Sequence, residues 1–148
     1  MQRSITFVIG LAFILSGSVL HAQTQFSIRA ASDEAVPGWE RMEFDNHPVW
    51  VSPTVSLTAA DIARAQQRTD QDGRTFIGVV FTEPGAKKMR DLSAAQMNKL
   101  IAMVLDGKVI FAPKIRSQIN TDAVITGSGP NGLSAAAAQQ ILASLNQK

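Results

Sequence analysis

A glycine-rich segment near the end of the chain has the spacing of a phosphate-binding loop. Gly127, Gly129 and Gly132 match the G-x-G-x-x-G pattern, in which glycines let the backbone approach a pyrophosphate at a helix N-terminus. Only 16 residues follow Gly132, too few for the second strand and the acidic ribose ligand of such a unit, and Pro130 lacks a backbone N–H. We therefore expect a strand-to-helix loop at Gly127–Gly132, with no nucleotide bound there.

Metal-binding chemistry has little support among the other residue types. Asp70 and Asp72 are spaced like the opening of a calcium loop, but the late glutamate and further oxygen ligands of such a loop are missing. Zinc sites need clustered Cys and His, whereas the chain has no Cys and His47 is the only His after residue 22. We expect a hairpin turn at Asp70–Gly73, a loop position for His47, and no metal or cofactor.

Catalysis by side chains also lacks a suitable set of residues. A Ser-His-Asp arrangement would have to use His47, and no Ser lies in a G-x-S-x-G turn. The acidic pairs Glu40/Glu43 and Asp70/Asp72 could act as acid and base, but nearness in sequence does not set the separation that such chemistry requires. We assign no catalytic residues and predict that the protein is not an enzyme.

The first 22 residues have the features of a secretory signal peptide. Arg3 precedes an apolar stretch, Ile5–Leu15, and Ala22 supplies the small residue at which a signal peptidase cuts. The apolar stretch is shorter than the ~20 residues that span a bilayer. We predict cleavage after Ala22 and a periplasmic or secreted protein, with an uncleaved anchor as the alternative.

Cleavage would leave 126 residues, enough for one domain with a single hydrophobic core. Without cysteine, that core must be stable without disulfides. Removal of Arg3 leaves 13 basic and 12 acidic side chains, and a net charge of +1 does not indicate a nucleic-acid partner. No second apolar segment of spanning length follows the signal, so we expect no stable membrane insertion of the mature chain.

Residues 23–56 carry weaker patterns, and we predict an N-terminal extension with one or two strands. Phe26–Ala30 alternates apolar and polar residues, and Val49–Ser52 is rich in residues that favour strands. Turn signals lie between them, at Pro37-Gly38 and Asp45-Asn46. Trp39 and Trp50 flank this region, and we expect both to cover a core rather than to stack on a ligand.

The next residues predict a helix followed by an antiparallel hairpin. Thr82 is a suitable N-cap, with a carboxylate and a proline in the first turn of the helix. Leu100–Leu105 contains six apolar residues without alternation, which is typical of a strand covered on both faces or of part of a buried helix. Asp106-Gly107 favours a two-residue turn into a second strand at Val109–Ala112, so we predict a hairpin.

The end of the chain predicts one more strand and a helix. Ala123–Thr126 is a short strand, and Ser134 is a candidate N-cap for the helix after it. Apolar residues recur along one face of this helix, at Leu133, Ala137, Ile141 and Leu145. We expect this face to bury the hairpin. The predicted fold is α+β, a two-layer sandwich of a mostly antiparallel sheet with two main helices on one face.

The order of several short segments resembles the head of the first periplasmic domain of SecD, a subunit of the bacterial protein-export machinery. The resemblance covers roughly Leu57 to Leu145 and predicts a SecD-head-like domain at residues 57–148. It rests on Asp61-Ile62, Phe81-Thr82 with Gly85, Leu105-Asp-Gly107, Ala112-Pro113, Ile119 and Ile125-Thr-Gly127. The loop before the last helix is longer than is usual in the family, and Ala136–Ala138 replaces acidic residues.

The stretch Leu57–Gln67 allows two interpretations. Its Ala and Gln content favours a helix, with Thr58 and Asp61 as a capping pair. The resemblance instead implies a short turn followed by a strand. Because intrinsic propensity is a weak guide that tertiary contacts override, we predict a strand from about Ala63 onward.

The resemblance implies a non-enzymatic module, since the SecD head handles polypeptide. Family members also carry six membrane helices that convert an ion gradient into movement, so we expect no gradient-driven pulling by this chain alone. We predict a periplasmic module that binds unfolded or exported polypeptides, or envelope proteins, in connection with export or envelope biogenesis. The alternative is a structural or adaptor protein of the envelope that reuses the fold without binding unfolded chains. The sequence assigns no polypeptide-binding residues.

Overall fold

The computed structural model describes residues 25–127 and 132–146, so the predicted signal peptide lies outside the described residues. A first sheet holds three strands from the N-terminal part and two from the predicted hairpin, in the order β2-β3-β1-β7-β8, with the short β4 paired to β1. Its strands are β1 Phe26–Ser32, β2 Glu40–Phe44, β3 His47–Val51, β4 Leu57–Thr58, β7 Leu100–Leu105 and β8 Lys108–Phe111. Every pairing in it is antiparallel.

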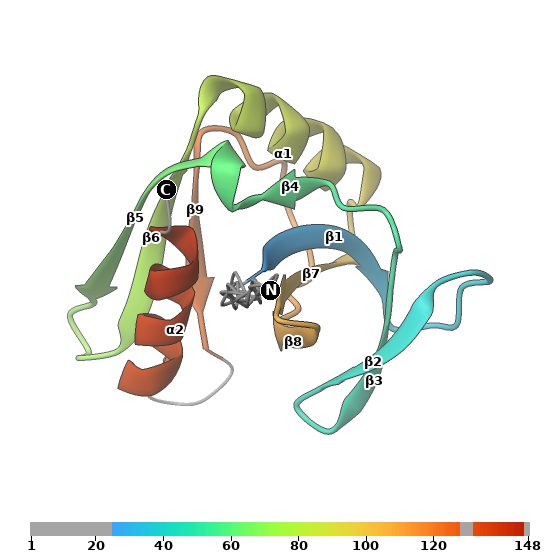
Figure 1. Cartoon of the computed structure of the whole chain (residues 1–148), viewed down its shortest axis with the longest axis horizontal. Helices are drawn as coiled ribbons and strands as arrows, with labels where there is room; N and C mark the ends of the chain where they lie inside the picture. Colours follow the sequence, from blue (N-terminus) through green and yellow to red (C-terminus); the bar gives the residue numbers. More distant parts are fainter. Residues whose placement is uncertain (1–24, 128–131, 147–148) are drawn as a thin grey trace, which may run out of the picture.

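A second sheet of three antiparallel strands stands beside the first (Figure 1). Its order is β5-β6-β9, with β5 at Ile62–Thr69, β6 at Thr75–Phe81 and β9 at Asp122–Thr126. The described residues also form two helices, α1 at Glu83–Ala95 and α2 at Ala135–Leu145, and a 3-10 turn at Ala59–Asp61. The α+β class with mostly antiparallel pairing is confirmed, and the strands divide between two sheets.

Strand β7 is buried on both faces, which explains its unbroken apolar sequence. Ile101, Met103 and Leu105 face a main core shared by both sheets and both helices. The residues between them, Ala102 and Val104, face a smaller core with Ala31, Val49, Val51 and Val109. The first sheet curls so that β2 approaches β8 and encloses this smaller core. The predicted hairpin is confirmed, with Asp106 and Gly107 both at positive φ.

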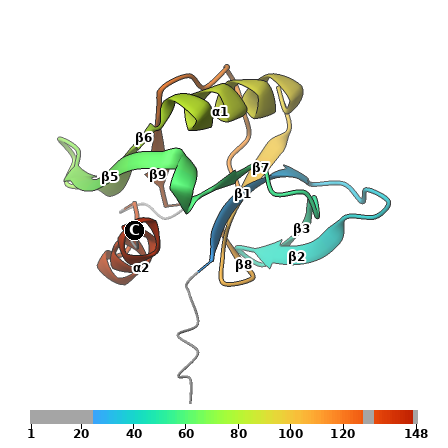
Figure 2. The ribbon, with the colours of Figure 1, turned by 45° about the horizontal axis from the view of Figure 1, so that its top comes forward.

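Helix α2 packs mainly on β5 and β6, so the expectation that it buries the hairpin is wrong (Figures 1 and 2). Ser134 caps the helix as predicted, its hydroxyl accepting from the Ala137 N–H at 3.2 Å. Ile141 and Leu145 are each 2% exposed and join the main core. The apolar stripe was therefore identified correctly, and only the strands that it covers differ.

Within the predicted extension at residues 23–56, the described part from residue 25 onward holds three strands rather than one or two. Strand β2 was not predicted because three of its five residues are charged or polar, although Met42 and Phe44 alternate toward the smaller core. The turn signal at Asp45-Asn46 is confirmed, since both residues have positive φ and connect β2 to β3. Strand β1 lies between β3 and β7, so this part of the chain shares both cores with the predicted domain.

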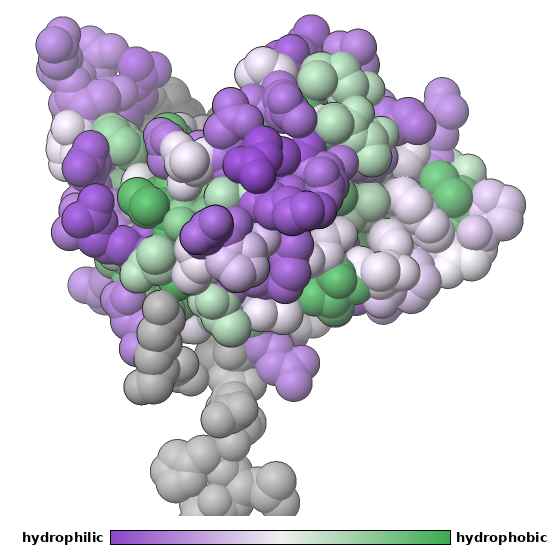
Figure 3. Space-filling view, turned by 90° about the horizontal axis from the view of Figure 1, so that it is seen from above, coloured by the Kyte–Doolittle hydropathy of each residue, from purple (hydrophilic) through white to green (hydrophobic). Residues whose placement is uncertain are grey.

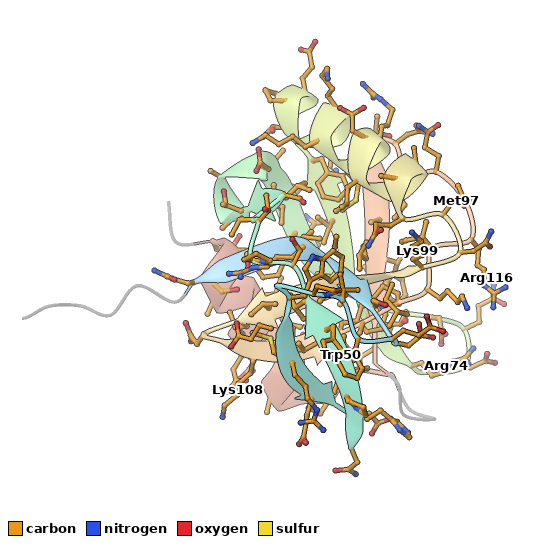
Figure 4. The ribbon with its side chains drawn as sticks, turned by 90° about the vertical axis from the view of Figure 1, so that its right-hand side faces the viewer. Trp50, Arg74, Met97, Lys99, Lys108 and Arg116 are labelled. Atoms are coloured by element: carbon orange, nitrogen blue, oxygen red, sulfur yellow. The ribbon has the colours of Figure 1, made fainter. Side chains whose placement is uncertain are left out.

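The two tryptophans do not cover a core as expected. Both are half-buried, and neither belongs to the main or the smaller core. Trp50 lies on the face of β3 opposite to Val49 and Val51, because side chains alternate along a strand (Figure 4). Its cross-strand neighbours are Arg41 on β2 and Ser32 on β1.

The stretch Leu57–Gln67 adopts the conformation that the resemblance implied. A two-residue strand and the 3-10 turn lead into β5, and the strand begins at Ile62, close to the predicted start. Pairing with β6 along its whole length outweighs the helical propensity of its Ala and Gln residues. The hairpin turn expected at Asp70–Gly73 is also confirmed, between β5 and β6.

Candidate functional site

A groove of about 330 Å³ lies between the two sheets, and we call it the inter-sheet groove. One side is formed by β9, and the other by Phe111 at the end of β8 and the residues that follow it up to Ser117. Its lining is mostly apolar and consists of Met89, Ile101, Met103, Phe111, Pro113, Lys114, Ile115, Arg116, Ser117, Ile119, Ala123, Val124 and Thr126. By contrast, the face seen looking down on α1 is mainly hydrophilic, with apolar residues in small separate patches (Figure 3).

Strand β9 borders the groove with a strand edge. It is the last strand of its sheet among the described residues and pairs only with β6. The Phe81 N–H donates to the Thr121 carbonyl at 3.0 Å, so these two residues form a hydrogen-bonded pair. From there, every second pair of residues along β6 and β9 is hydrogen-bonded. In an antiparallel pair, the intervening residues direct their N–H and C=O groups away from the partner. These residues are Asp122, Val124 and Thr126, and Val124 is 52% exposed.

The opposite side of the groove carries a second edge. The Ile101 N–H donates to the Pro113 carbonyl at 3.1 Å, and the Ile115 N–H donates to the Lys99 carbonyl at 2.8 Å. These bonds extend the pairing of β7 beyond β8, with Lys114 opposite Leu100. By the same alternation, the N–H and C=O of Lys114 point away from β7. Two strand edges thus flank one apolar groove.

Side chains from α1 and β7 form the floor of the groove, and a side chain of α1 also anchors the loop that leads into β9. Met89 of α1 is fully buried, and Ile101 and Met103 of β7 are nearly so. The buried Ser93 hydroxyl accepts the Ile119 N–H at 2.9 Å and fixes the loop that leads into β9 to α1. The buried side chains of Met89, Ile101 and Met103 give the groove an apolar floor that is continuous with the main core.

Asp61 fixes the start of α1, the helix that supplies part of the floor. Its side chain is 8% exposed and receives the Lys88 ammonium at 2.8 Å and the Thr58 N–H at 2.9 Å. Its carbonyl accepts the Thr82 N–H at 2.9 Å, while the Thr82 hydroxyl caps the helix through the Gly85 N–H at 3.1 Å. A Cβ on Gly85 would lie 2.9 Å from the Asp61 Cβ, so this contact requires glycine.

Burial raises the pKa of Asp61, but the hydrogen bonds from Lys88 and Thr58, with the Lys88 charge, outweigh burial and hold this pKa below its ordinary value. The carboxylate therefore adds stability above the ordinary pKa, and this stability is lost as the pH falls through the lowered folded value.

Replacing Asp61 by asparagine should lower the free energy of unfolding by about 1–2 kcal/mol at pH 7, because hydrogen bonds to a charged group are lost. The difference from the unmodified protein should shrink as the pH falls below about 4, because the carboxyl group of the unfolded chain is protonated there, before that of the folded protein, whose pKa is lowered. Urea unfolding at several pH values measures this difference. Asp91→Asn is the matched control: its pair with Lys87 is exposed on both sides and should contribute under about 0.5 kcal/mol. Equal effects of the two variants would contradict the account of Asp61.

The other residues considered for chemistry lie apart from the groove. The Asp70 side chain accepts the N–H groups of Asp72 and Arg74 at 2.9 Å, and Arg74 pairs with both carboxylates. Glu40 and Glu43 are exposed on β2, and His47 is the exposed first residue of β3 rather than a loop residue. Among residues 25–127 and 132–146, no three His, Asp or Glu side chains are grouped so that they could hold a metal ion.

The glycine-rich segment is described only at its ends, Gly127 and Gly132. The Leu133 N–H donates to the Thr75 carbonyl at 2.9 Å, and Gly132 bridges to Thr75 with a φ of 76°. A Cβ on Gly132 would lie 3.1 Å from the Thr75 nitrogen. The close approach of two backbones explains glycine at this position without a bound phosphate.

Comparison with known proteins agrees with this architecture. The family model described as SecDF, P1 head subdomain, matches residues 33–146. The chain belongs to this family. SecD of Acidaminococcus fermentans is 41% identical over 73 residues, which is 49% of this chain and 18% of that protein. SecDF of Thermus thermophilus is 44% identical over 72 residues, 48% of this chain and 10% of that protein. The chain thus spans less than a fifth of the length of these relatives.

Two solved SecDF structures share the fold of this P1-head-like chain. One, described as a membrane component that enhances protein export, has a TM-score of 0.63 and 26% identity, covering 83% of this chain and 62% of that one. SecDF in its super-membrane-facing form has a TM-score of 0.64 and 29% identity, covering 83% and 18%. In the described part of this chain, no helix has both the length and the apolar character needed to span a bilayer.

The sequence did not predict the groove, although some residues behind the family resemblance line it and others hold the helix that supplies part of its floor. Pro113 and Ile119 line the groove, whereas Asp61, Thr82 and Gly85 fix the start of α1. What sequence reasoning lacked was the pairing of residues 113–115 with 99–101, which places β9 and the segment after β8 on opposite sides of one groove.

Proposed function

We propose that this chain is a periplasmic, non-enzymatic module that binds extended polypeptide in the inter-sheet groove, in connection with protein export. Membership in the SecDF P1 head subdomain family supports the export context. The observation that carries the proposal is the apolar groove flanked by two strand edges whose outward-facing backbone groups point away from β6 and β7. Such an edge accepts an added strand through main-chain hydrogen bonds, while the groove holds its side chains.

This mode of binding suits a ligand of varied sequence. Every polypeptide offers the same backbone donors and acceptors, and the lining of the groove is mostly apolar. Ordering a flexible chain offsets much of the gain, so we expect weak binding with little sequence preference, near micromolar or about −8 kcal/mol.

A non-enzymatic role agrees with the lining of the groove. Its polar side chains are Lys114, Arg116, Ser117 and Thr126, and no carboxylate or histidine accompanies them to act as a general base. The acidic pairs considered from the sequence lie elsewhere, and Asp70 and Asp72 are engaged by Arg74.

The proposed location follows from the predicted signal at residues 1–22 with cleavage after Ala22. The SecDF relatives place the family in protein translocation. The natural ligands would then be unfolded exported proteins that pass through the periplasm. Unfolded envelope proteins offer the same backbone donors and acceptors and would also be ligands.

Titration of the purified protein with several reduced, unfolded periplasmic proteins tests the proposal. We expect dissociation constants in the micromolar range that change little at moderately raised salt, because the net charge of +1 that remains after the predicted cleavage leaves little attraction to screen. The same proteins in their folded, oxidised form are the control and should not bind. Absence of binding up to high micromolar concentration would favour the structural or adaptor alternative, and detected turnover of any substrate would contradict both.

A further inference from the structure

We propose that the inter-sheet groove prefers extended apolar segments flanked by acidic residues, an inference that rests on the proposed polypeptide binding. The preference comes from two cations on the rim of the groove, Lys114 and Arg116. Both lie on the wall formed by residues 111–117, two positions apart, and both side chains are exposed. Figure 4 shows Arg116 projecting from the flank of the molecule that also carries Met97 and Lys99.

Neither rim cation is neutralised by the rest of the described chain. The other exposed basic residues often have partners, as Lys87 does in Asp91 and Arg74 in Asp70. Lys114 and Arg116 make no ion pair and no side-chain hydrogen bond with another described residue. The stretches that the structure does not describe contain no Asp or Glu.

The groove itself also offers no acidic side chain to these cations. Its lining contains no carboxylate. The nearest acid along β9, Asp122, lies on the outer face of the second sheet, beside Arg64 and Val80, and its carboxylate accepts the Thr121 hydroxyl at 2.9 Å. An apolar floor with an unneutralised positive rim is complementary to an apolar segment with negative flanks.

The expected preference is moderate because the cations are exposed. A surface ion pair contributes up to about 1 kcal/mol, and two such pairs give a difference in affinity on the order of tenfold at low salt. The preference should fade as salt is raised, because exposed charges are screened. Binding through the backbone and the apolar floor should remain.

Three synthetic peptides test this inference on the purified protein. Each contains the same nine-residue core of alternating valine and threonine, flanked at both ends by two glutamates, two glutamines or two lysines. At low salt we expect the glutamate peptide to bind roughly tenfold more tightly than the glutamine peptide, and the lysine peptide to bind more weakly than both. The double variant Lys114→Gln/Arg116→Gln should bind all three equally. Arg64→Gln/Arg68→Gln removes the same charge from the outer face of β5 and should keep the order.

Each outcome separates the preference from binding itself. Equal affinities of the three peptides for the unmodified protein would overturn the acidic preference while leaving polypeptide binding intact. If the Arg64→Gln/Arg68→Gln variant bound the three peptides equally, the preference would depend on the overall charge of the protein. That result would overturn the role of Lys114 and Arg116. Binding of none of the peptides would overturn both the preference and the proposed function. Sedimentation of the protein alone would show a dimer if a second copy occupied the groove, which again would contradict the proposal.

Discussion

Replacing Ile141 by aspartate should lower the free energy of unfolding by more than about 3 kcal/mol, the largest effect on stability that we expect. Ile141 is 2% exposed on the face of α2 that packs against β5 and β6. An aspartate there would place an unpaired charge among apolar side chains of the main core. Thermal or urea unfolding measures the change.

Gln140→Asp is the matched control, because Gln140 is the neighbouring residue on the exposed face of α2. It introduces the same side chain without burial and should change the free energy of unfolding by no more than about 0.5 kcal/mol. Similar melting curves for Ile141→Asp and Gln140→Asp would contradict the packing of α2 on the second sheet.

Replacing Val124 by proline should weaken polypeptide binding about tenfold. The Val124 N–H points away from β6, so proline removes a donor of the open edge without breaking the ladder between β6 and β9. Loss of one hydrogen bond lowers affinity by up to roughly tenfold, and the proline ring also obstructs an added strand. Titration with an unfolded periplasmic protein measures the effect.

Val124→Thr is the control for this variant, because it keeps the backbone N–H and a β-branched side chain at the same exposed position. We expect it to bind like the unmodified protein. Proline is tolerated on edge strands where its nitrogen faces outward, so Val124→Pro should remain folded with a nearly unchanged melting temperature. Full binding by a folded Val124→Pro protein would exclude the β9 edge as the contact.

Local patterns predicted the elements whose sequence carries a specific physical signal. Asp106-Gly107 favours a turn with positive φ, and together with this turn the unbroken apolar run before it indicates a strand covered on both faces. Thr82 and Ser134 have hydroxyls that cap helices, and both do so. In each case, the residue type and its neighbours along the chain determine the structure.

Features that depend on contacts between distant segments could not be predicted in the same way. The apolar face of α2 is visible in its sequence, but a stripe of Leu, Ala and Ile does not specify which sheet it covers. Strand β2 has a weak alternation that its charged residues obscure, and the curl of the first sheet determines that Met42 and Phe44 face inward. The inter-sheet groove depends on both sheets, so no single segment indicates it.

Residue-specific amide hydrogen exchange, measured by NMR with and without an unfolded polypeptide, tests the central claim most directly. Without ligand, the N–H groups of Asp122, Val124 and Thr126 should exchange fast, whereas those of Ala123 and Ile125 are protected by β6. Saturating polypeptide should slow exchange at Val124 and its outward-facing neighbours and leave Ala123 and Ile125 unchanged. Binding without any added protection at Val124 or Lys114 would show that the polypeptide lies elsewhere and would contradict strand addition in the groove.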